Sequence, residues 1–226
     1  MGGERKVNSQ VLATVVGLVV ALGGPLLLIS PASRLLGRSD AIVTKVLEQA
    51  VLWVFLAMVL AVVLIWERKP LTSLWFQPFH WQSLAWGLLL AATMICLVFP
   101  LRVWLVRVSG LPDFQAGLER VLALPIWFRV VAVVTAGVVE ETLFHGYALT
   151  RVGAFMGSYW LAALVLVPAF ALVHLPFWGS GFVLSLLPAG VLSAAFFIWK
   201  QDLLAMVVAH TFVDAMGLIF APPVSK

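Results

Sequence analysis

Long apolar runs separated by short polar segments make up most of the chain. Seven runs approach the ~20 residues that a helix needs to cross a hydrocarbon core. Helices satisfy their own backbone hydrogen bonds in lipid, so such runs are typical of spanning helices. The pattern predicts an all-α fold, a polytopic membrane helix bundle of about seven transmembrane helices, at residues 11–29, 46–66, 83–105, 126–149, 160–178, 182–198 and 203–220.

One segment that mixes polar residues with leucines does not fit this pattern of spans. Residues 111–124 place Asp113, Glu119 and Arg120 among leucines, which favours a short interfacial helix lying on the membrane surface. The first apolar run lacks a clear cleavage signal and is interpreted as a retained first helix. The length fits one transmembrane domain over residues 1–226.

Composition supports a membrane protein. Hydrophobic residues make up 63% of the chain and charged residues 11%, with a mean hydropathy of +1.09. Soluble domains contain roughly 45–50% apolar residues. The net charge of +4 comes from scattered Lys and Arg, which indicates contact with lipid headgroups and no nucleic-acid partner. We therefore expect a multi-pass integral membrane protein, in the inner or plasma membrane of a cell.

Few ionisable residues lie within the last four predicted spans. An acidic side chain at the centre of a membrane helix costs about 2.5–3.5 kcal/mol on insertion scales. One interpretation is that these residues only pair with one another and hold helices together. The other is that they form a reactive site. The residues concerned are Glu140, Glu141, His145, His174, His210 and Asp214.

Depth and spacing favour the reactive site. If helices rise 1.5 Å per residue, Glu140, His174 and His210 each lie ~15–21 Å from the same predicted membrane face. Adjacent residues on a helix differ by about 100° in direction, so Glu140 and Glu141 cannot face the same point. One carboxylate is expected to enter the site while the other fixes the helix. Gly137 and Gly146 are expected to let neighbouring helices approach closely.

The residue types suit water activation. A carboxylate with a histidine can act as a general base, and a second histidine can stabilise a developing oxyanion. The set Glu140, His174 and His210 could instead hold a divalent metal such as zinc, so the need for a cofactor stays open. His-Glu-x-x-His and His-x-x-Glu-His are both absent, which makes a conventional zinc peptidase less favoured.

Three ordered segments resemble a known family. "EETLFHG", "FALVH" and "HTFVD" are similar to the motifs Glu-Glu-x-x-x-Arg, Phe-x-x-x-His and His-x-x-x-Asn/Asp of the CAAX protease and bacteriocin-processing (CPBP, Abi) family of intramembrane proteases. The resemblance covers about residues 120–220, taken as the motif-bearing catalytic core. It implies an intramembrane endopeptidase, whose substrate is a membrane-associated peptide or a prenylated C-terminal tail.

The resemblance also implies roles for single residues. Glu140 with His174 would activate water, His210 with Asp214 would bind the oxyanion, and Glu141 would support the site. Phe170 would line the cavity that receives the substrate.

His145 departs from the family pattern. It stands where the family has arginine, and a histidine is a weaker substitute in an ion pair with Glu141. A weaker role in substrate binding is expected for it.

Two other functions stay open from the sequence. A non-proteolytic membrane scaffold, sensor or bacteriocin-immunity protein could use the same residues for binding, and a proton-coupled transporter could use them as a relay. Arg102 and Arg107 are expected to extend to the lipid headgroups.

Overall fold

The computed structural model describes the backbone of residues 2–29 and 42–220, and this part of the chain is helical with no strand. Residues 30–41, between the first two predicted spans, lie outside the described residues. The helices, in chain order, are α1 (Gly2–Leu18), η1 (Val19–Gly23), α2 (Gly24–Ile29), α4 (Ile42–Ala61), η2 (Val62–Trp66), η3 (Leu71–Leu74), α5 (Trp81–Thr93), η4 (Met94–Val98), α6 (Phe99–Ser109), α7 (Gln115–Leu122), α8 (Ile126–Thr135), η5 (Ala136–Glu140), η6 (Thr142–Leu149), α9 (Thr150–Met156), α10 (Tyr159–Val173), α11 (Leu175–Trp178), α12 (Ser180–Lys200) and α13 (Leu203–Leu218).

The prediction of an all-α polytopic bundle is confirmed, and the protein is an integral membrane protein. Among the described residues, four helices are long and apolar enough to cross a membrane: Ser9–Leu26, Ile42–Trp66, Trp81–Ser109 and Ser180–Lys200. Residues Ile126–Met156 form a further long helix, which makes an angle of 119° with α7. Because of this bend, α7 lies across the end of that helix, inside the segment predicted as an interfacial helix.

The last part of the bundle has shorter helices than the sequence predicts. The apolar helices α10 and α13 have 15 and 16 residues. The predicted run 160–178 does not form one helix, because α10 ends at Val173 and α11 begins at Leu175 with Pro176 in its first turn. Proline lacks the backbone N–H that continues a helix, so a break here has a local cause. His174 lies at this break.

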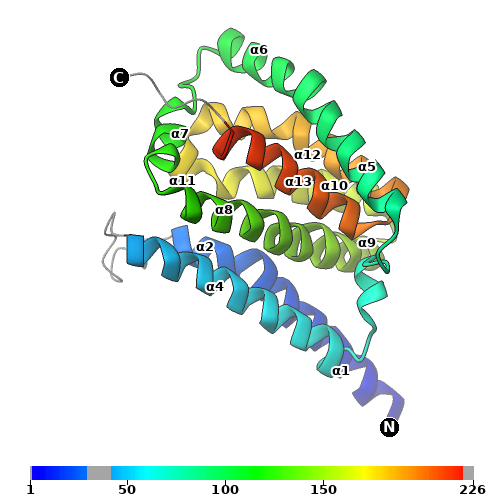
Figure 1. Cartoon of the computed structure of the whole chain (residues 1–226). Coiled ribbons are helices and arrows are strands. Elements are labelled where there is room, and N and C mark those ends of the chain that lie inside the picture. Colours follow the sequence, from blue (N-terminus) through cyan, green and yellow to red (C-terminus); the bar gives the residue numbers. More distant parts are fainter. Residues whose placement is uncertain (1, 30–41, 221–226) are drawn as a thin grey trace.

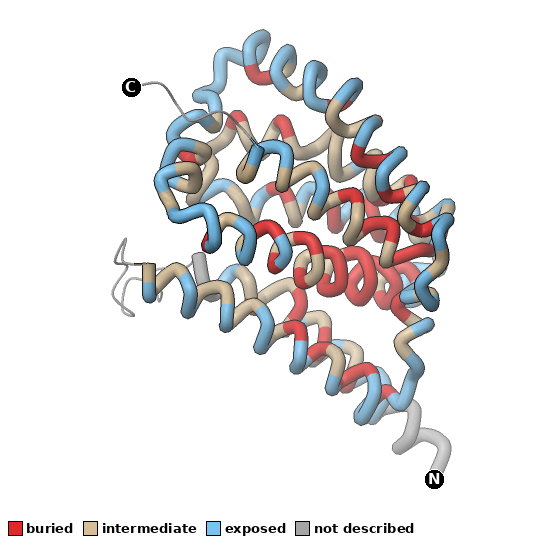
Figure 2. The backbone as a smooth tube through the Cα atoms, viewed as in Figure 1, coloured by how far each residue is buried: buried red, intermediate tan, exposed pale blue. Residues whose placement is uncertain are grey.

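The α8–η5–η6–α9 helix, here called the central helix, runs through the middle of the bundle. Figure 1 shows α1–α2 and α4 along one side of it, with α10, α12 and α13 on the other side and α5–α6 beyond them. Buried residues are concentrated along the second half of this helix (Figure 2), where Val139 and Tyr147 are fully buried. The central helix is therefore the element against which the other helices pack.

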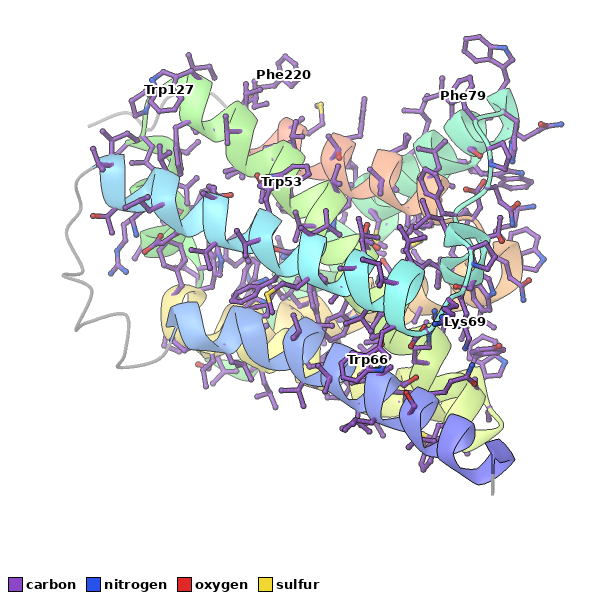
Figure 3. All side chains as sticks on the ribbon, turned by 90° about the horizontal axis from the view of Figure 1, so that it is seen from below. Trp53, Trp66, Lys69, Phe79, Trp127 and Phe220 are labelled. Atoms are coloured by element: carbon purple, nitrogen blue, oxygen red, sulfur yellow. The ribbon has the colours of Figure 1, made fainter. Side chains whose placement is uncertain are left out.

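Aromatic and basic side chains lie toward the two ends of the bundle. Trp127 lies toward one end, and Phe79 and Lys69 lie toward the other (Figure 3). Trp53, in the middle of α4, donates a hydrogen bond from its indole nitrogen to Thr135 Oγ1 of α8 at 3.0 Å. The positions of Trp127, Phe79 and Lys69 match the interfacial preference of aromatic and long basic side chains in membrane proteins, whereas Trp53 joins two helices within the bundle.

Glycines allow the close helix contacts that the sequence predicts. A Cβ at Gly137 would overlap the hydroxyl of Thr211 on α13, and a Cβ at Gly146 would lie 2.9 Å from the Leu203 side chain. Small residues let helix backbones approach in membranes. Gly137 therefore brings the central helix onto α13 one residue from His210.

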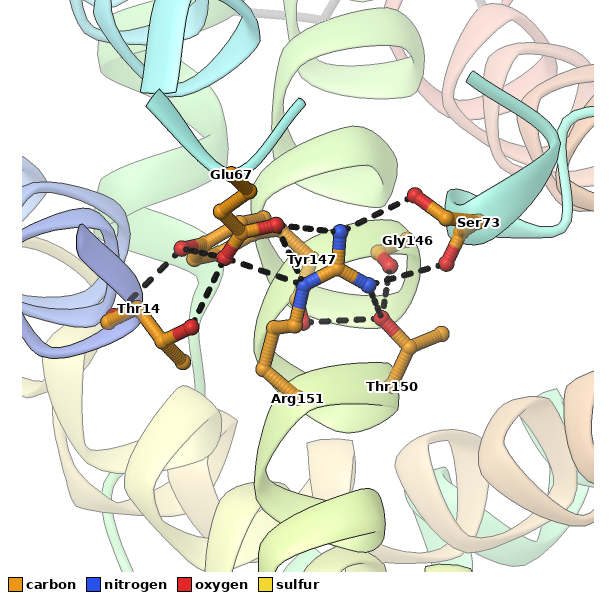
Figure 4. Close-up of polar contacts among 7 residues, drawn as sticks. All are labelled: Thr14, Glu67, Ser73, Gly146, Tyr147, Thr150 and Arg151. Carbon is orange, nitrogen blue, oxygen red and sulfur yellow. Dashed lines mark hydrogen bonds and ion pairs between the residues drawn. The ribbon is translucent and has the colours of Figure 1, made fainter. Parts of the chain in front are cut away.

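A buried polar group joins the first helices to the central helix at the end of the bundle near α9 (Figure 4). It is called here the Glu67–Arg151 cluster and comprises Thr14, Glu67, Ser73, Tyr147, Thr150 and Arg151. Arg151 donates to the Glu67 carboxylate from Nη2 at 2.7 Å and from Nε at 2.9 Å, and to the Ser73 carbonyl at 2.9 Å.

Two hydroxyl groups complete the hydrogen bonding of Glu67. Thr14 and Tyr147 donate to its Oε1 at 2.9 and 3.0 Å. Burial raises the pKa of Glu67, but the hydrogen bonds and attraction of Arg151 outweigh burial, and the pKa is lowered overall from its ordinary value of 4.5. Glu67 thus remains a carboxylate that fixes α1, η2 and the central helix together.

Candidate functional site

The two adjacent glutamates lie at a change in the winding of the central helix. Glu140 ends the π-helix η5, and Glu141 separates η5 from the π-helix η6, which contains His145. π-Helical segments are rare and frequently occur at functional sites. Glu141 is buried, with 5% of its surface exposed, whereas Glu140 is half-buried. The two carboxylates have different surroundings, in agreement with their expected difference in direction.

Glu141 contacts two histidines. Its Oε1 lies 2.7 Å from His210 Nδ1 on α13, in hydrogen-bonding geometry. Its Oε2 lies 2.6 Å from His145 Nδ1, one turn further along the central helix. This second contact lies outside hydrogen-bonding orientation, because neither atom has a hydrogen-bond partner among the described residues. Glu141 therefore fixes α13 to the central helix at this level.

His210 lies between two carboxyl groups. Glu141 accepts from its Nδ1, so that nitrogen carries a proton when Glu141 is ionised. On the other side of the ring, Nε2 lies 3.5 Å from Asp214 Oδ2, one turn along α13. That distance is too long for a strong hydrogen bond. Nε2 is therefore the ring nitrogen that is available to bind a new partner. We call Glu141, His145, His210 and Asp214 the Glu141–histidine cluster.

His174 is oriented by its own helix. Its Nδ1 lies 2.8 Å from the carbonyl oxygen of Phe170, one turn earlier. A carbonyl oxygen only accepts hydrogen bonds, so Nδ1 carries the proton and, in the neutral ring, Nε2 keeps its lone pair. Phe170 and Phe182 pack against the ring, with centroid distances of 4.8 and 5.8 Å. His174 is thus held as a proton acceptor at Nε2.

Glu140 has charged neighbours but no hydrogen-bond partner for its carboxylate among the described residues. The ionisable groups close enough to act on it electrostatically are His174, His210, Asp214 and Glu141. The chain thus brings an acid from the central helix near imidazoles from α10 and α13. In contrast to Glu141, Glu140 keeps its carboxylate oxygens unengaged.

The remaining predicted site residues lie around this group. Phe170 packs between Phe144 of the central helix and His174, with centroid distances of 4.6 and 4.8 Å. His145 is buried against the ring of Phe197, at 5.5 Å between centroids. His145 is therefore engaged with Glu141 and with apolar neighbours.

Two neighbours of the site were missed or misplaced by the sequence analysis. Phe182 of α12, which covers His174, has no motif that would identify it. The prediction that Arg102 extends to the headgroups is wrong, because its Nη2 donates to Ser185 of α12 at 3.2 Å and its guanidinium lies 5.5 Å from the Phe182 ring centroid. An arginine near the end of an apolar run gives no signal that separates these two directions.

Glu140, His174 and His210 are the residues that the sequence offers as ligands for a metal. Among the described side chains, no group of three or more His, Cys, Asp or Glu residues is arranged to hold a metal ion. Glu140, His174 and His210 are therefore neighbours that are not grouped as three metal ligands. A polar hollow of about 310 Å³ lies elsewhere, where α12 ends and α13 begins, and is lined by residues that include His80, Lys200 and Asp202.

The comparisons with known proteins agree with the motifs. Neither the curated proteins nor the solved structures give a match to the chain. Residues 122–216 match the family model described as "Type II CAAX prenyl endopeptidase Rce1-like". This range contains Glu140, Glu141, His174, His210 and Asp214. The resemblance seen in the sequence is thereby confirmed over residues 122–216, which are similar to the CAAX protease family, a family of proteases.

Proposed function

We propose that the protein is an intramembrane endopeptidase that hydrolyses a peptide bond with a water activated by Glu140 and His174. The observation that carries the proposal is the division of work between the adjacent glutamates. Both carboxylate oxygens of Glu141 contact a histidine, His145 or His210. The carboxylate of Glu140 has no hydrogen-bond partner among the described residues, although two imidazoles are close enough to act on it electrostatically. A role in helix packing would account for Glu141, which is paired, but gives no reason for the unpaired Glu140.

The first step is the activation of water. A water placed between Glu140 and His174 Nε2 meets two acceptors, which fix its hydrogens and direct an oxygen lone pair to the substrate carbonyl. Glu140 accepts a proton as the water oxygen bonds to the carbonyl carbon. Breakage of the C–N bond then transfers that proton to the leaving amine, which leaves one new carboxyl group and one new amino group. His174 is suited to this role because its Nδ1 is already occupied by the Phe170 carbonyl.

The oxyanion requires a donor at the same level. His210 Nε2 can supply it when protonated, since its contact with Asp214 is long and its ring is fixed by Glu141 through Nδ1. Donors that are already oriented before the reaction stabilise developing charge effectively. Asp214 accordingly acts through His210, and Glu141 and His145 are positioning residues.

We infer that the substrate is a membrane-associated peptide. The site lies between helices of an integral membrane protein, and the family description names a prenyl endopeptidase, which supports a tail carrying a prenyl group as one such substrate. Lipid is the other expected partner.

Cleavage by purified protein in liposomes tests the proposal. The probe is a fluorogenic peptide with a farnesylated cysteine close to a free C-terminus. Glu140→Gln and His174→Asn are each expected to lower the cleavage rate by about 10²–10⁴, the usual contribution of general acid–base catalysis. The matched control is Glu119→Gln, which removes an exposed glutamate on α7 and should leave the rate unchanged.

The cleavage rate and the thermal unfolding of the two site variants together decide between catalysis and helix packing. Loss of cleavage in the two site variants, with unaltered thermal unfolding, supports the endopeptidase. Cleavage retained at the wild-type rate in both, with lower unfolding temperatures, would assign these residues to helix packing and overturn the proposal.

A further inference from the structure

Arg102 is a permanent cation inside a membrane-spanning helix. It belongs to the span Trp81–Ser109 and lies seven residues, ~10 Å, before the end of α6 at Ser109. Its guanidinium faces α12, where Nη2 donates to Ser185 Oγ at 3.2 Å. Arginine stays charged in proteins, and intramembrane charges are costly and commonly functional.

The charge of Arg102 is poorly satisfied. Among the described residues, no carboxylate lies within ion-pairing distance of it, and its Nε is buried without an acceptor. Ser185 offers a neutral hydroxyl whose own proton is donated to the Phe182 carbonyl at 2.8 Å. Arg151, in contrast, is fully engaged by Glu67 and Ser73. A role in helix packing therefore accounts for Arg151, whose donors have acceptors. It does not account for Arg102, whose Nε has no acceptor among the described residues.

The surroundings of Arg102 join it to the proposed active site. Its guanidinium lies 5.5 Å from the ring centroid of Phe182 and 5.9 Å from that of Phe114. The same Phe182 ring packs on His174 at 5.8 Å. Asp214, the partner of His210, is the acid close enough to act on Arg102 electrostatically. Arg102 therefore borders the site and shares an aromatic wall with His174.

We propose that Arg102 forms an anion-binding subsite that takes a carboxylate of the peptide substrate. A guanidinium binds planar carboxylates through its forked donors, and the buried Nε of Arg102 has no acceptor among the described residues. The carboxylate has two possible sources, the C-terminus of the substrate or an Asp or Glu side chain. This inference rests on the proposed function, because it names the chemistry of the substrate at the same site.

Binding, measured without turnover, tests the subsite. The full chain in detergent carries Glu140→Gln to prevent cleavage, and calorimetric titration compares three probes. The first is N-dodecanoyl-Val-Leu with a free C-terminus, the second its C-terminal amide, and the third N-dodecanoyl-Glu-Leu-amide, whose only carboxylate is a side chain. We expect at least one acid to bind about tenfold or more tightly than the neutral amide, since hydrogen bonds to charged groups are worth that much. The stronger acid identifies the source.

Substitutions assign the preference to Arg102. Arg102→Gln should remove the preference for the acid and leave amide binding unchanged, and Arg102→Lys should retain part of it. The matched control is Arg107→Gln, since Arg107 is an exposed arginine on the same helix and should not affect the preference.

Equal binding of all three probes, or a preference that persists in Arg102→Gln, would overturn the inference. Because the readout is binding, this failure is distinct from a failure of wild-type cleavage, which would instead count against the proposed function.

Discussion

Two buried carboxylates, Glu141 on the central helix and Glu67 packed against it, have partners that differ in kind. Glu67 is bonded by Arg151, Thr14 and Tyr147, all with good hydrogen-bond distances. Glu141 is contacted by two histidines, and its Oε2 has no hydrogen-bond partner in the part of the chain that the structure describes. Both carboxylates are buried, with 2% and 5% of their surfaces exposed. Burial alone therefore does not distinguish an acid with a structural role, such as Glu67, from an acid in the proposed active site, such as Glu141.

The difference lies in whether the partner can change its charge. Arginine remains a cation, so the Glu67–Arg151 cluster has one stable arrangement. Histidine can gain or lose a proton, so the Glu141–histidine cluster can take part in proton transfer. A satisfied cluster fixes the helices, and under the proposed function an incompletely satisfied one keeps donors and acceptors for a substrate.

The largest effect is expected from Glu67→Gln. The substitution leaves the Arg151 guanidinium buried without a negative partner, which typically costs 3–5 kcal/mol, roughly, of unfolding free energy. The measurement is unfolding in bicelles titrated with SDS. Adding Arg151→Met should recover part of the loss, because it removes the unpaired charge. A change below about 1 kcal/mol in the single variant would contradict a structural role for this cluster.

A smaller effect is expected from Gly137→Ala, which affects the other cluster. The new methyl group would overlap Thr211 of α13, and overpacking of this kind costs about 1–3 kcal/mol. It should also displace His210 from Glu141 and lower the cleavage rate. Thr211→Ala, which removes the overlapping hydroxyl, should restore part of both properties. Normal cleavage by Gly137→Ala would argue against a tight coupling of α13 to the central helix.

Thr14→Val should have a modest effect. It removes one hydrogen bond to Glu67 at 2.9 Å while Arg151 and Tyr147 remain, so we expect a loss of about 1 kcal/mol. The cleavage rate of the folded protein should not change. The same unfolding titration and peptide assay measure both quantities, and a lost cleavage rate would mean that the two clusters are not independent.

The smallest effect is expected from mild acid. Because the pKa of Glu67 is lowered on folding, its contribution to stability is complete above its ordinary pKa of 4.5 and is lost only as the pH falls through the folded value. The difference in unfolding free energy between wild type and Glu67→Gln should therefore be constant from pH 8 to about pH 5. A difference that declines across this range would require a different partner for Arg151.

The sequence predicted the helices and the grouping of the motif residues well, for physical reasons. Apolar runs of spanning length and glycines at helix contacts are local signals, and Gly137 lies where a close contact with α13 was expected. The different directions of the Glu140 and Glu141 side chains followed from helix geometry. The break at His174 was missed, although Pro176 supplied a local signal for it.

Contacts between distant segments were not predictable. Glu67 and Arg151 are 84 residues apart and each lies at the end of an apolar run, where a charge normally contacts headgroups or water. Arg102 gives the same signal but turns inward to Ser185. In both cases the direction of the side chain depends on which helix packs beside it, which one sequence does not reveal.

One paired measurement tests the division between the two clusters most directly. Glu141→Gln and Glu67→Gln are compared for cleavage of the farnesylated peptide, with each rate divided by the fraction of protein that is folded. The expected result is a loss of about 100-fold or more for Glu141→Gln, whose histidines lose their anchor, and an unchanged rate per folded molecule for Glu67→Gln. Equal losses per folded molecule in the two variants would contradict the account.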